Sequence, residues 1–144
     1  MHEIGNEKPS RIVRIFKDKS FARFTRRQRI SDPDLCEALE RANRGLVDAD
    51  LGGGVIKQRV ARPNEGRSGG FRTILFFRVQ QRAFFVFGFA KNDLDNISDD
   101  DLKILKRTAQ ETLGLTEAQI ETLLEAGTLI EVNCDAEQND SQDL

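Results

Sequence analysis

The feature that most constrains the fold of this chain is the concentration of phenylalanine near its middle. Seven of the ten Phe residues lie in two apolar segments, Phe71–Val79 and Arg82–Phe89, which are separated by Gln80 and Gln81. Aromatic and β-branched residues favour strands, and two such runs joined by two residues favour a hairpin. The pattern predicts two adjacent antiparallel strands at the centre of a sheet, with the rings packed in the core.

The rest of the chain predicts further strands and amphipathic helices, from β-branched runs, helical spacing of apolar residues, N-cap residues and glycine stops. Gly52–Gly54 is interpreted as a flexible connection between two of these elements. The predicted strands are Arg11–Phe16 and Val55–Arg62, and the predicted helices are Lys19–Arg29, Ser31–Gly45, Ser98–Gly114 and Thr116–Gly127. Two helices before a run of strands predict an α+β domain with a mainly antiparallel sheet and additional C-terminal helices.

The charge of the chain is strongly divided along its length. Residues 1–91 hold 19 Lys and Arg against 10 Asp and Glu, a net charge of +9, whereas residues 92–144 hold 3 against 14, a net charge of −11. A basic body is typical of proteins that bind a polyanion, and the alternative is a solvated surface. We predict a flexible N-terminus at 1–10, a folded domain at 11–132 and an acidic, disordered tail at 133–144.

The residues that the chain lacks exclude several kinds of site. It has no Trp or Tyr, and its single His is His2. Zinc sites of the His/Cys kind and Ser-His-Asp or Cys-His catalysis are therefore not expected. Cys36 and Cys134 match no metal or redox spacing and are interpreted as structural or incidental, which favours the reducing cytoplasm. No apolar run approaches the roughly 20 residues that span a membrane.

A candidate phosphate site is formed by basic residues on and beside the predicted strands. Lys57 and Arg59 are two apart on one strand, so they share a face at a separation of roughly 6.5–7 Å. An antiparallel hairpin returns Arg72 to the neighbourhood of Arg59 or of Arg62. Clustered Arg and Lys suit phosphate, and the alternative is a solubilising surface. The candidate residues are Lys57, Arg59, Arg62, Arg67, Arg72 and Lys91.

A second basic group lies on the first predicted helix. Arg23, Arg26 and Arg27 stand beside the apolar stripe that contains Phe21 and Phe24. This helix face is able to bind nucleic acid, to bind an acidic protein segment or only to be solvated, and the sequence leaves all three readings open.

Several ordered motifs resemble a known family. They are Gly45–Gly54, Lys57–Arg62, Ser68–Thr73 and Phe85–Asn92. In these segments the chain resembles the RelE-type toxins of bacterial toxin–antitoxin pairs, within the wider RelE/HigB/ParE superfamily. The resemblance covers roughly residues 11–132. It implies a compact α+β fold in which two N-terminal helices pack on a small antiparallel sheet.

The resemblance also implies a function and its partners. Such toxins are typically endoribonucleases that cut messenger RNA, often on the ribosome, and they use neither metal nor cofactor. The ribose 2′-hydroxyl attacks the adjacent phosphorus, and the 5′-oxygen leaves. The implied partners are messenger RNA, the ribosome and a cognate antitoxin. The antitoxin is expected to cover the basic face with an acidic or amphipathic segment.

The resemblance implies catalytic roles for four residues of the candidate site. Lys57 and Arg59 match the family's basic pair, Arg72 matches the Arg of its Gly-aromatic-Arg element, and Lys91 matches the basic residue that closes the last strand. Arg62 is a weaker match. Arg59 and Arg72 are suited to stabilise the charge that develops at phosphorus.

The chain departs from the family pattern because it has no Tyr and no His in the matching segments. The identity of the general base and of any base-stacking aromatic residue is therefore open. A lysine crowded by cations has a lowered pKa, so Lys57 and Lys91 are candidates for proton transfer. Phe71 and Phe89 are candidates for stacking, although both are expected in the core.

Two other functions remain open at this point. One is a toxin of the same fold that inhibits a target such as DNA gyrase without cutting RNA. The other is a non-catalytic RNA-binding domain, which the missing Tyr and His favour. The cationic cluster favours cleavage over gyrase inhibition, because a phosphate site needs it and an inhibitor is not expected to.

Overall fold

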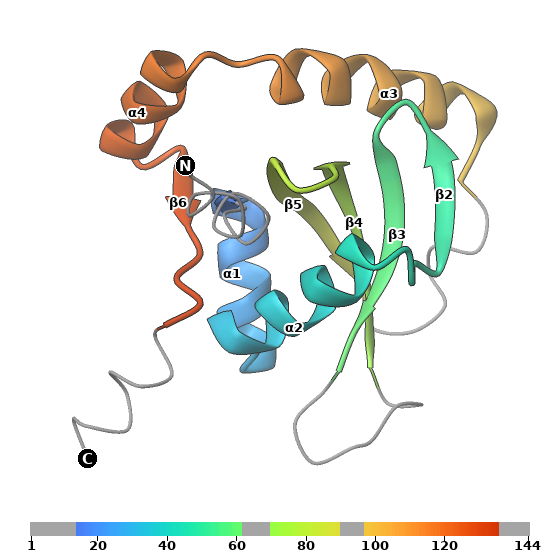
Figure 1. The fold of residues 1–144 in the computed structure, drawn as a ribbon, viewed down its shortest axis with the longest axis horizontal. Helices are drawn as coiled ribbons and strands as arrows, with labels where there is room; N and C mark the ends of the chain where they lie inside the picture. Colours follow the sequence, from blue (N-terminus) through green and yellow to red (C-terminus); the bar gives the residue numbers. More distant parts are fainter. Residues whose placement is uncertain (1–13, 62–69, 90–96, 136–144) are drawn as a thin grey trace, which may run out of the picture.

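The fold is known from a computed structural model, which describes residues 14–61, 70–89 and 97–135. Within these ranges the chain forms four helices and one six-stranded sheet (Figure 1). The strands are β1 Arg14–Asp18, β2 Ala49–Gly52, β3 Val55–Val60, β4 Phe71–Arg78, β5 Arg82–Phe89 and β6 Leu129–Glu131. The helices are α1 Lys19–Gln28, α2 Asp32–Asn43, α3 Asp99–Leu113 and α4 Glu117–Ala126. The predicted α+β class is confirmed.

The sheet is mainly antiparallel, as the sequence predicted, and one parallel pair makes it a mixed sheet. The strand order is β2-β3-β4-β5-β1-β6. β1 pairs in parallel with β5, and the other pairings in the described sheet are antiparallel. The parallel pair arises because two helices and three strands separate β1 from β5, so that no hairpin constrains their direction.

The phenylalanine-rich strands lie in the middle of the sheet, as predicted. β4 and β5 pair with each other and turn near Gln80, which has a φ of 60°. Their register shifts between Ile74 and Leu75, which lie opposite Phe87 and Phe85 respectively. Val86 is therefore an extra residue in β5, and such a bulge changes which face the following side chains occupy.

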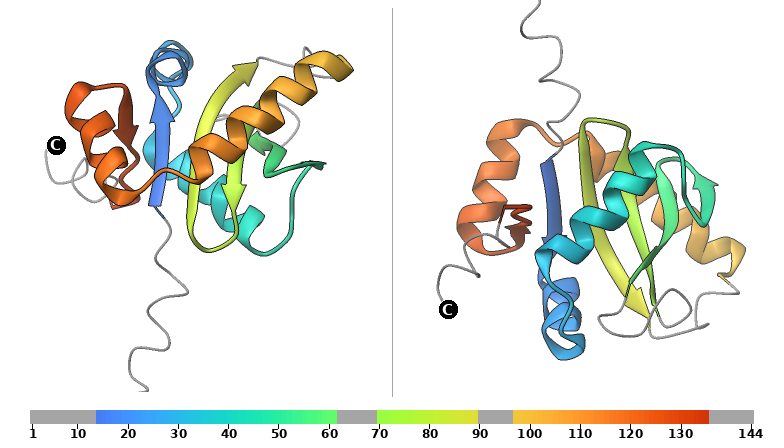
Figure 2. Two further views of the ribbon diagram at one scale, coloured as in Figure 1. Left: turned by 90° about the horizontal axis from the view of Figure 1, so that it is seen from above. Right: turned by 60° about the horizontal axis from the view of Figure 1, so that its bottom comes forward.

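Two layers of helices cover the two faces of the sheet (Figure 2). On one face the apolar residues of α1 and α2, among them Phe21 and Leu35, pack on Leu75 and Phe85. On the other face α3 and α4 pack on the sheet through Ala109, Leu113 and Ile120. The sheet thus separates two cores.

Local sequence explains where the helices begin. Asp18 accepts a hydrogen bond from the backbone N–H of Phe21 and caps α1. Ser31 and Asp34 form a capping box at α2, and Thr116 and Gln119 form another at α4. A cap satisfies N–H groups that have no partner in the first helical turn.

Two short strands and one covalent link were not predicted. β2 overlaps the segment interpreted as flexible, and β6 has three residues, too few to show a period of two. Cys36 and Cys134 form a disulfide with Cα atoms 5.8 Å apart. Their pairing confirms the structural interpretation of these cysteines and excludes the incidental one. It also removes the argument for a reducing compartment.

The disulfide fixes the start of the predicted acidic tail. The backbone N–H of Asn133 donates to the carboxylate of Asp32 at 2.9 Å, and Cys134 is bonded to α2. Residues 136–144 lie outside the described ranges. No helix in the described part of the chain is both long and apolar enough to cross a membrane.

Candidate functional site

The basic residues of β3 and β4 meet on one face of the sheet. Arg59 lies directly opposite Arg72, as the predicted hairpin requires, and Lys57 lies opposite Ile74. Side chains directly opposite each other share a face with their Cβ atoms about 5 Å apart, and residues two apart on a strand also share it. Lys57, Arg59 and Arg72 therefore form one surface, here called the cationic face.

The cationic face lies beyond the part of the sheet that α3 covers. At the tip of the β2–β3 hairpin, a Cβ added to Gly54 would lie 2.7 Å from the side chain of Leu113 in α3. A Cβ added to the neighbouring Gly53 would lie 3.0 Å from the side chain of Lys106, also in α3. The helix therefore crosses the sheet where β3 begins, while Arg59 lies near the end of that strand (Figure 1).

Two phenylalanines of β5 extend the cationic face. Phe89 lies opposite Arg72, Phe87 lies opposite Ile74, and the ring centroids of the two Phe residues are 6.4 Å apart. The side chain of Phe87 is 45% exposed, in contrast to the buried rings of β4. The bulge at Val86 places both rings on this face. We call Phe87 and Phe89 the aromatic edge.

Phe87 was expected in the core, and that expectation was wrong. Strict alternation along β5 would place Phe87 with Phe85, against α1 and α2. The bulge reverses the alternation, so Gly88 occupies that position, and a Cβ there would lie 2.3 Å from the ring of Phe24. Phe71 is buried, as expected, in edge-to-face contact with Phe24.

One carboxylate faces the cationic face. An Asp48 carboxylate oxygen lies 3.8 Å from the Arg72 guanidinium, and each side chain is 30% exposed. The backbone N–H of Asp48 donates to the carbonyl of Lys57 at 3.1 Å and to the side chain of Gln58 at 3.2 Å. Sequence reasoning missed Asp48 because no local spacing marks it and its contacts are with residues of β3 and β4 that are distant in the sequence.

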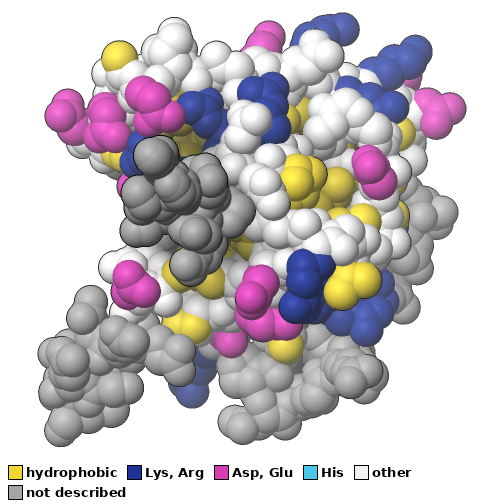
Figure 3. Space-filling view, in the orientation of Figure 1, with side chains coloured by type: hydrophobic (Ala, Val, Ile, Leu, Met, Phe, Trp, Pro, Cys, Tyr) yellow, Lys and Arg dark blue, Asp and Glu magenta, His cyan; other side chains and the backbone are white. Residues whose placement is uncertain are grey.

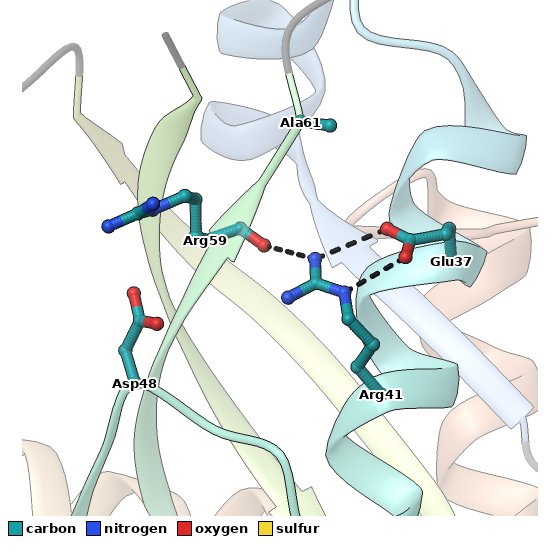
Figure 4. A pocket seen from close by; sticks show the side chains of 5 residues that line it. All are labelled: Glu37, Arg41, Asp48, Arg59 and Ala61. Carbon is teal, nitrogen blue, oxygen red and sulfur yellow. Dashed lines mark hydrogen bonds and ion pairs between the residues drawn. The ribbon is translucent and has the colours of Figure 1, made fainter. Parts of the chain in front are cut away.

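A pocket of about 470 Å³ opens beside the edge of β3, between α2 and the segment before β2 (Figure 4). Arg41 donates to both carboxylate oxygens of Glu37 at 2.9 and 3.2 Å, and to the carbonyl of Arg59 at 2.7 Å. The side chains of Arg59 and Asp48 lie on the other side of β3 from the Arg41 guanidinium (Figure 4). The lining residues are Glu37, Arg41, Asp48, Arg59 and Ala61.

The predicted RNA-binding arginines of α1 lie elsewhere. Arg23, Arg26 and Arg27 are exposed on the outer side of α1. The inner side of α1 packs on the face of the sheet opposite to the cationic face, through Phe21 and Phe24. The structure therefore does not bring this group together with Lys57, Arg59 and Arg72.

Three predicted site residues lie outside the described ranges: Arg62, Arg67 and Lys91. His2 lies outside them as well. Across 14–61, 70–89 and 97–135, no three His, Cys, Asp or Glu side chains gather in a group that would hold a metal ion.

Other arginines of the basic body hold the C-terminal helices. Arg14 donates to Glu131 at 2.7 and 2.9 Å and to Glu117 at 2.8 Å, and these hydrogen bonds raise the pKa of Arg14. Arg82 donates to Glu117, and Arg78 and Arg82 donate to the carbonyl of Leu113 at the end of α3. We call Arg14, Arg78 and Arg82 the arginine clamp.

The clamp explains part of the charge division seen in the sequence. Acidic side chains gather over α4, whereas both basic and acidic side chains lie over α3 (Figure 3). The carboxylates of α4 meet Arg14 and Arg82 from β1 and β5. Some basic residues of the first part of the chain thus form ion pairs with acidic residues of the second part. The cationic face contains only some of the remaining basic residues.

One comparison with known proteins gives a match. The model of the family described as the RelE toxin of the RelE/RelB toxin–antitoxin system matches residues 13–132. This range contains every helix and strand of the described structure. No curated protein matches the chain.

Proposed function

Because this chain belongs to the RelE toxin family, we propose that it is a messenger-RNA endoribonuclease that acts during translation and cleaves at the cationic face. The observation that carries the proposal is the placement of Lys57, Arg59 and Arg72 on one rigid face of the sheet. Membership of the family also implies a cognate antitoxin as partner.

The proposed chemistry is transfer of the phosphate to the ribose 2′-hydroxyl. Negative charge grows on the phosphorus oxygens in the transition state, so donors fixed before the reaction stabilise it selectively. Arg59 and Arg72 lie opposite each other on paired strands, which holds their backbones in place. Guanidinium groups give paired hydrogen bonds to phosphate, and Lys57 adds a point charge.

The aromatic edge supports an RNA substrate. Phe89 continues the row of side chains from Arg59 and Arg72, and Phe87 continues the neighbouring row from Lys57 and Ile74. The Phe87 ring is accessible. Bases stack on aromatic side chains, with a gain of about 1–3 kcal/mol per base. We propose that a base next to the scissile phosphate stacks on Phe87.

The test is to induce the chain in a bacterial host and to map new 5′ ends across translated messages. Cuts in phase with codons, absent from an Arg72→Ala variant that accumulates equally, are the expected result. Growth arrest with intact messages would contradict cleavage and favour a gyrase-type inhibitor. Salt-dependent RNA binding with no cuts would favour a non-catalytic RNA-binding domain.

A further inference from the structure

The proposed cleavage needs a group that removes the proton of the 2′-hydroxyl. The cationic face offers guanidinium groups, which do not accept a proton, and the ammonium of Lys57, which must first lose one. The chain has no Tyr, and its single His lies at position 2. We propose that the general base is the carboxylate of Asp48, an inference that rests on the proposed ribonuclease function.

The backbone of Asp48 is held in place by a buried side chain. Gln58 is 1% exposed, and its amide donates to the carbonyls of Ala38 at 2.9 Å and Leu46 at 3.0 Å. Its amide oxygen accepts the N–H of Asp48 at 3.2 Å. Through these three hydrogen bonds, the side chain of Gln58 in β3 joins the segment before β2 to α2. A catalytic group needs such support to keep its geometry.

The carboxylate of Asp48 is close to the cationic face and accessible. It lies 3.8 Å from Arg72, which is an ion-pair distance rather than a hydrogen bond. Within the described ranges, no hydrogen bond is donated to its oxygens. It also lines the pocket with Arg59 (Figure 4). The oxygens are therefore available to accept a proton from a substrate that is bound by Arg72.

The second carboxylate that lines the pocket, that of Glu37, is paired with an arginine. Both oxygens of Glu37 accept hydrogen bonds from Arg41. Among the described residues, the charged groups around Asp48 are Arg72 from β4, Arg59 from β3 and the Glu37–Arg41 pair from α2. Of the two carboxylates, only Asp48 lies beside the cation that we assign to the transition state.

The step balances without a further reactant. Asp48 takes the proton of the 2′-hydroxyl while the 2′-oxygen bonds to phosphorus. The bond from phosphorus to the 5′-oxygen breaks, and that oxygen takes a proton from water. The products are a 2′,3′-cyclic phosphate and a 5′-hydroxyl end, and Asp48 returns its proton to solvent.

The experiment measures single-turnover cleavage of a defined message on purified ribosomes between pH 6 and 9. Carboxylic acids in water lose their proton near pH 4, so a reaction that uses a carboxylate as its base is expected to proceed at a nearly constant rate across this range. Asp48→Asn should lower the rate at pH 7 about 100-fold or more. Hydroxide must then serve as base, so the variant's rate should rise about tenfold per pH unit.

A control and a second variant distinguish a role of Asp48 as the base from a role in which it only holds the site in place. Asp50→Asn removes a nearby exposed carboxylate whose oxygen accepts the N–H of Gly52, and it should cleave like the unmodified protein. Asp48→Glu keeps the base and should restore a pH-independent rate. RNA affinity of Asp48→Asn should be unchanged or higher, because a negative charge is lost next to Arg72.

Four results would overturn the inference. The first is an Asp48→Asn variant that is as active as Asp50→Asn. The second is a rate for Asp48→Asn that is lower by the same factor at every pH, which indicates a positioning role. A rate for the unmodified protein that rises with pH would point to a lysine base instead. If the unmodified protein yields no cleavage at all, the proposed function itself fails, and Asp48 has no reaction to serve.

Discussion

The arginine clamp and the cationic face use the same kind of side chain in opposite ways. Arg14 of the clamp makes hydrogen bonds of 2.7–2.9 Å to two glutamates, whereas Arg72 of the cationic face has an ion pair of 3.8 Å with Asp48. The clamp joins β1 and β5 to the C-terminal helices, so its charges are used in folding. A longer pairing leaves more of the charge of Arg72 for an anionic ligand.

The largest expected effect is a loss of stability when the disulfide is broken, without a loss of cleavage at the cationic face. Reduction of Cys36–Cys134, or Cys36→Ser, should lower the free energy of unfolding by up to about 5 kcal/mol, because the link closes a loop across 98 residues. Thermal unfolding with and without reductant measures this. At temperatures below the unfolding midpoint of the reduced protein, RNA cleavage should persist, since neither cysteine contacts the cationic face. An unchanged melting temperature would contradict the expected role.

Removal of Arg72 tests the cationic face. Arg72→Ala should lower the cleavage rate about 100-fold or more and leave the melting temperature within a degree or two, because the lost ion pair is partly exposed. Arg72→Lys should recover only part of the rate, since it keeps the charge and loses the paired donors. Full activity of Arg72→Ala would remove this residue from the site.

Removal of Arg14 tests the clamp. Arg14→Ala should lower the free energy of unfolding by about 2 kcal/mol, because two glutamates lose a charged donor. Urea unfolding measures the change, and cleavage by the folded protein should be unaffected. Glu121→Gln is the control, because its contacts with Arg14 are 3.4 Å and its side chain is 59% exposed.

Salt dependence sharpens the comparison for binding. Replacing Arg59 by Ala should reduce the slope of log affinity for RNA against log salt by about 1, as expected for one phosphate contact. Replacing Arg82 by Ala should leave the slope unchanged, because that side chain donates to Glu117 and to the Leu113 carbonyl at the end of α3. Equal slopes for both variants would contradict the division between the two regions.

The smallest effect concerns a carboxylate. Burial raises the pKa of Asp18, while its hydrogen bond from Phe21 acts in the opposite direction. The folded state therefore binds this proton more readily than the unfolded state, and the contribution of Asp18 to stability falls as pH rises through its folded pKa. Asn is an equally good cap. Asp18→Asn should thus gain stability relative to the unmodified protein between acidic and neutral pH, measured by urea unfolding.

Much of the local structure was predictable from the sequence. The helices at Lys19–Gln28 and Glu117–Ala126 follow from apolar spacing and cap residues, which act within a few positions. The central hairpin β4–β5 follows from the phenylalanine pattern. The antiparallel pairing of β3 with β4, which was also predicted, places Arg72 beside Arg59. The proximity of these two residues was therefore predictable, whereas their chemical roles remain predictions.

By itself, the sequence determined the α+β class, the central hairpin, the cationic pair on β3 and the family. These depend on short-range periodicity and ordered motifs. Only the tertiary structure decided the parallel β1–β5 pair, the Cys36–Cys134 disulfide, the exposure of Phe87 and the approach of Asp48 to Arg72. The physical reason is that each of these joins distant segments or depends on one extra residue, Val86, which reverses the faces of a strand.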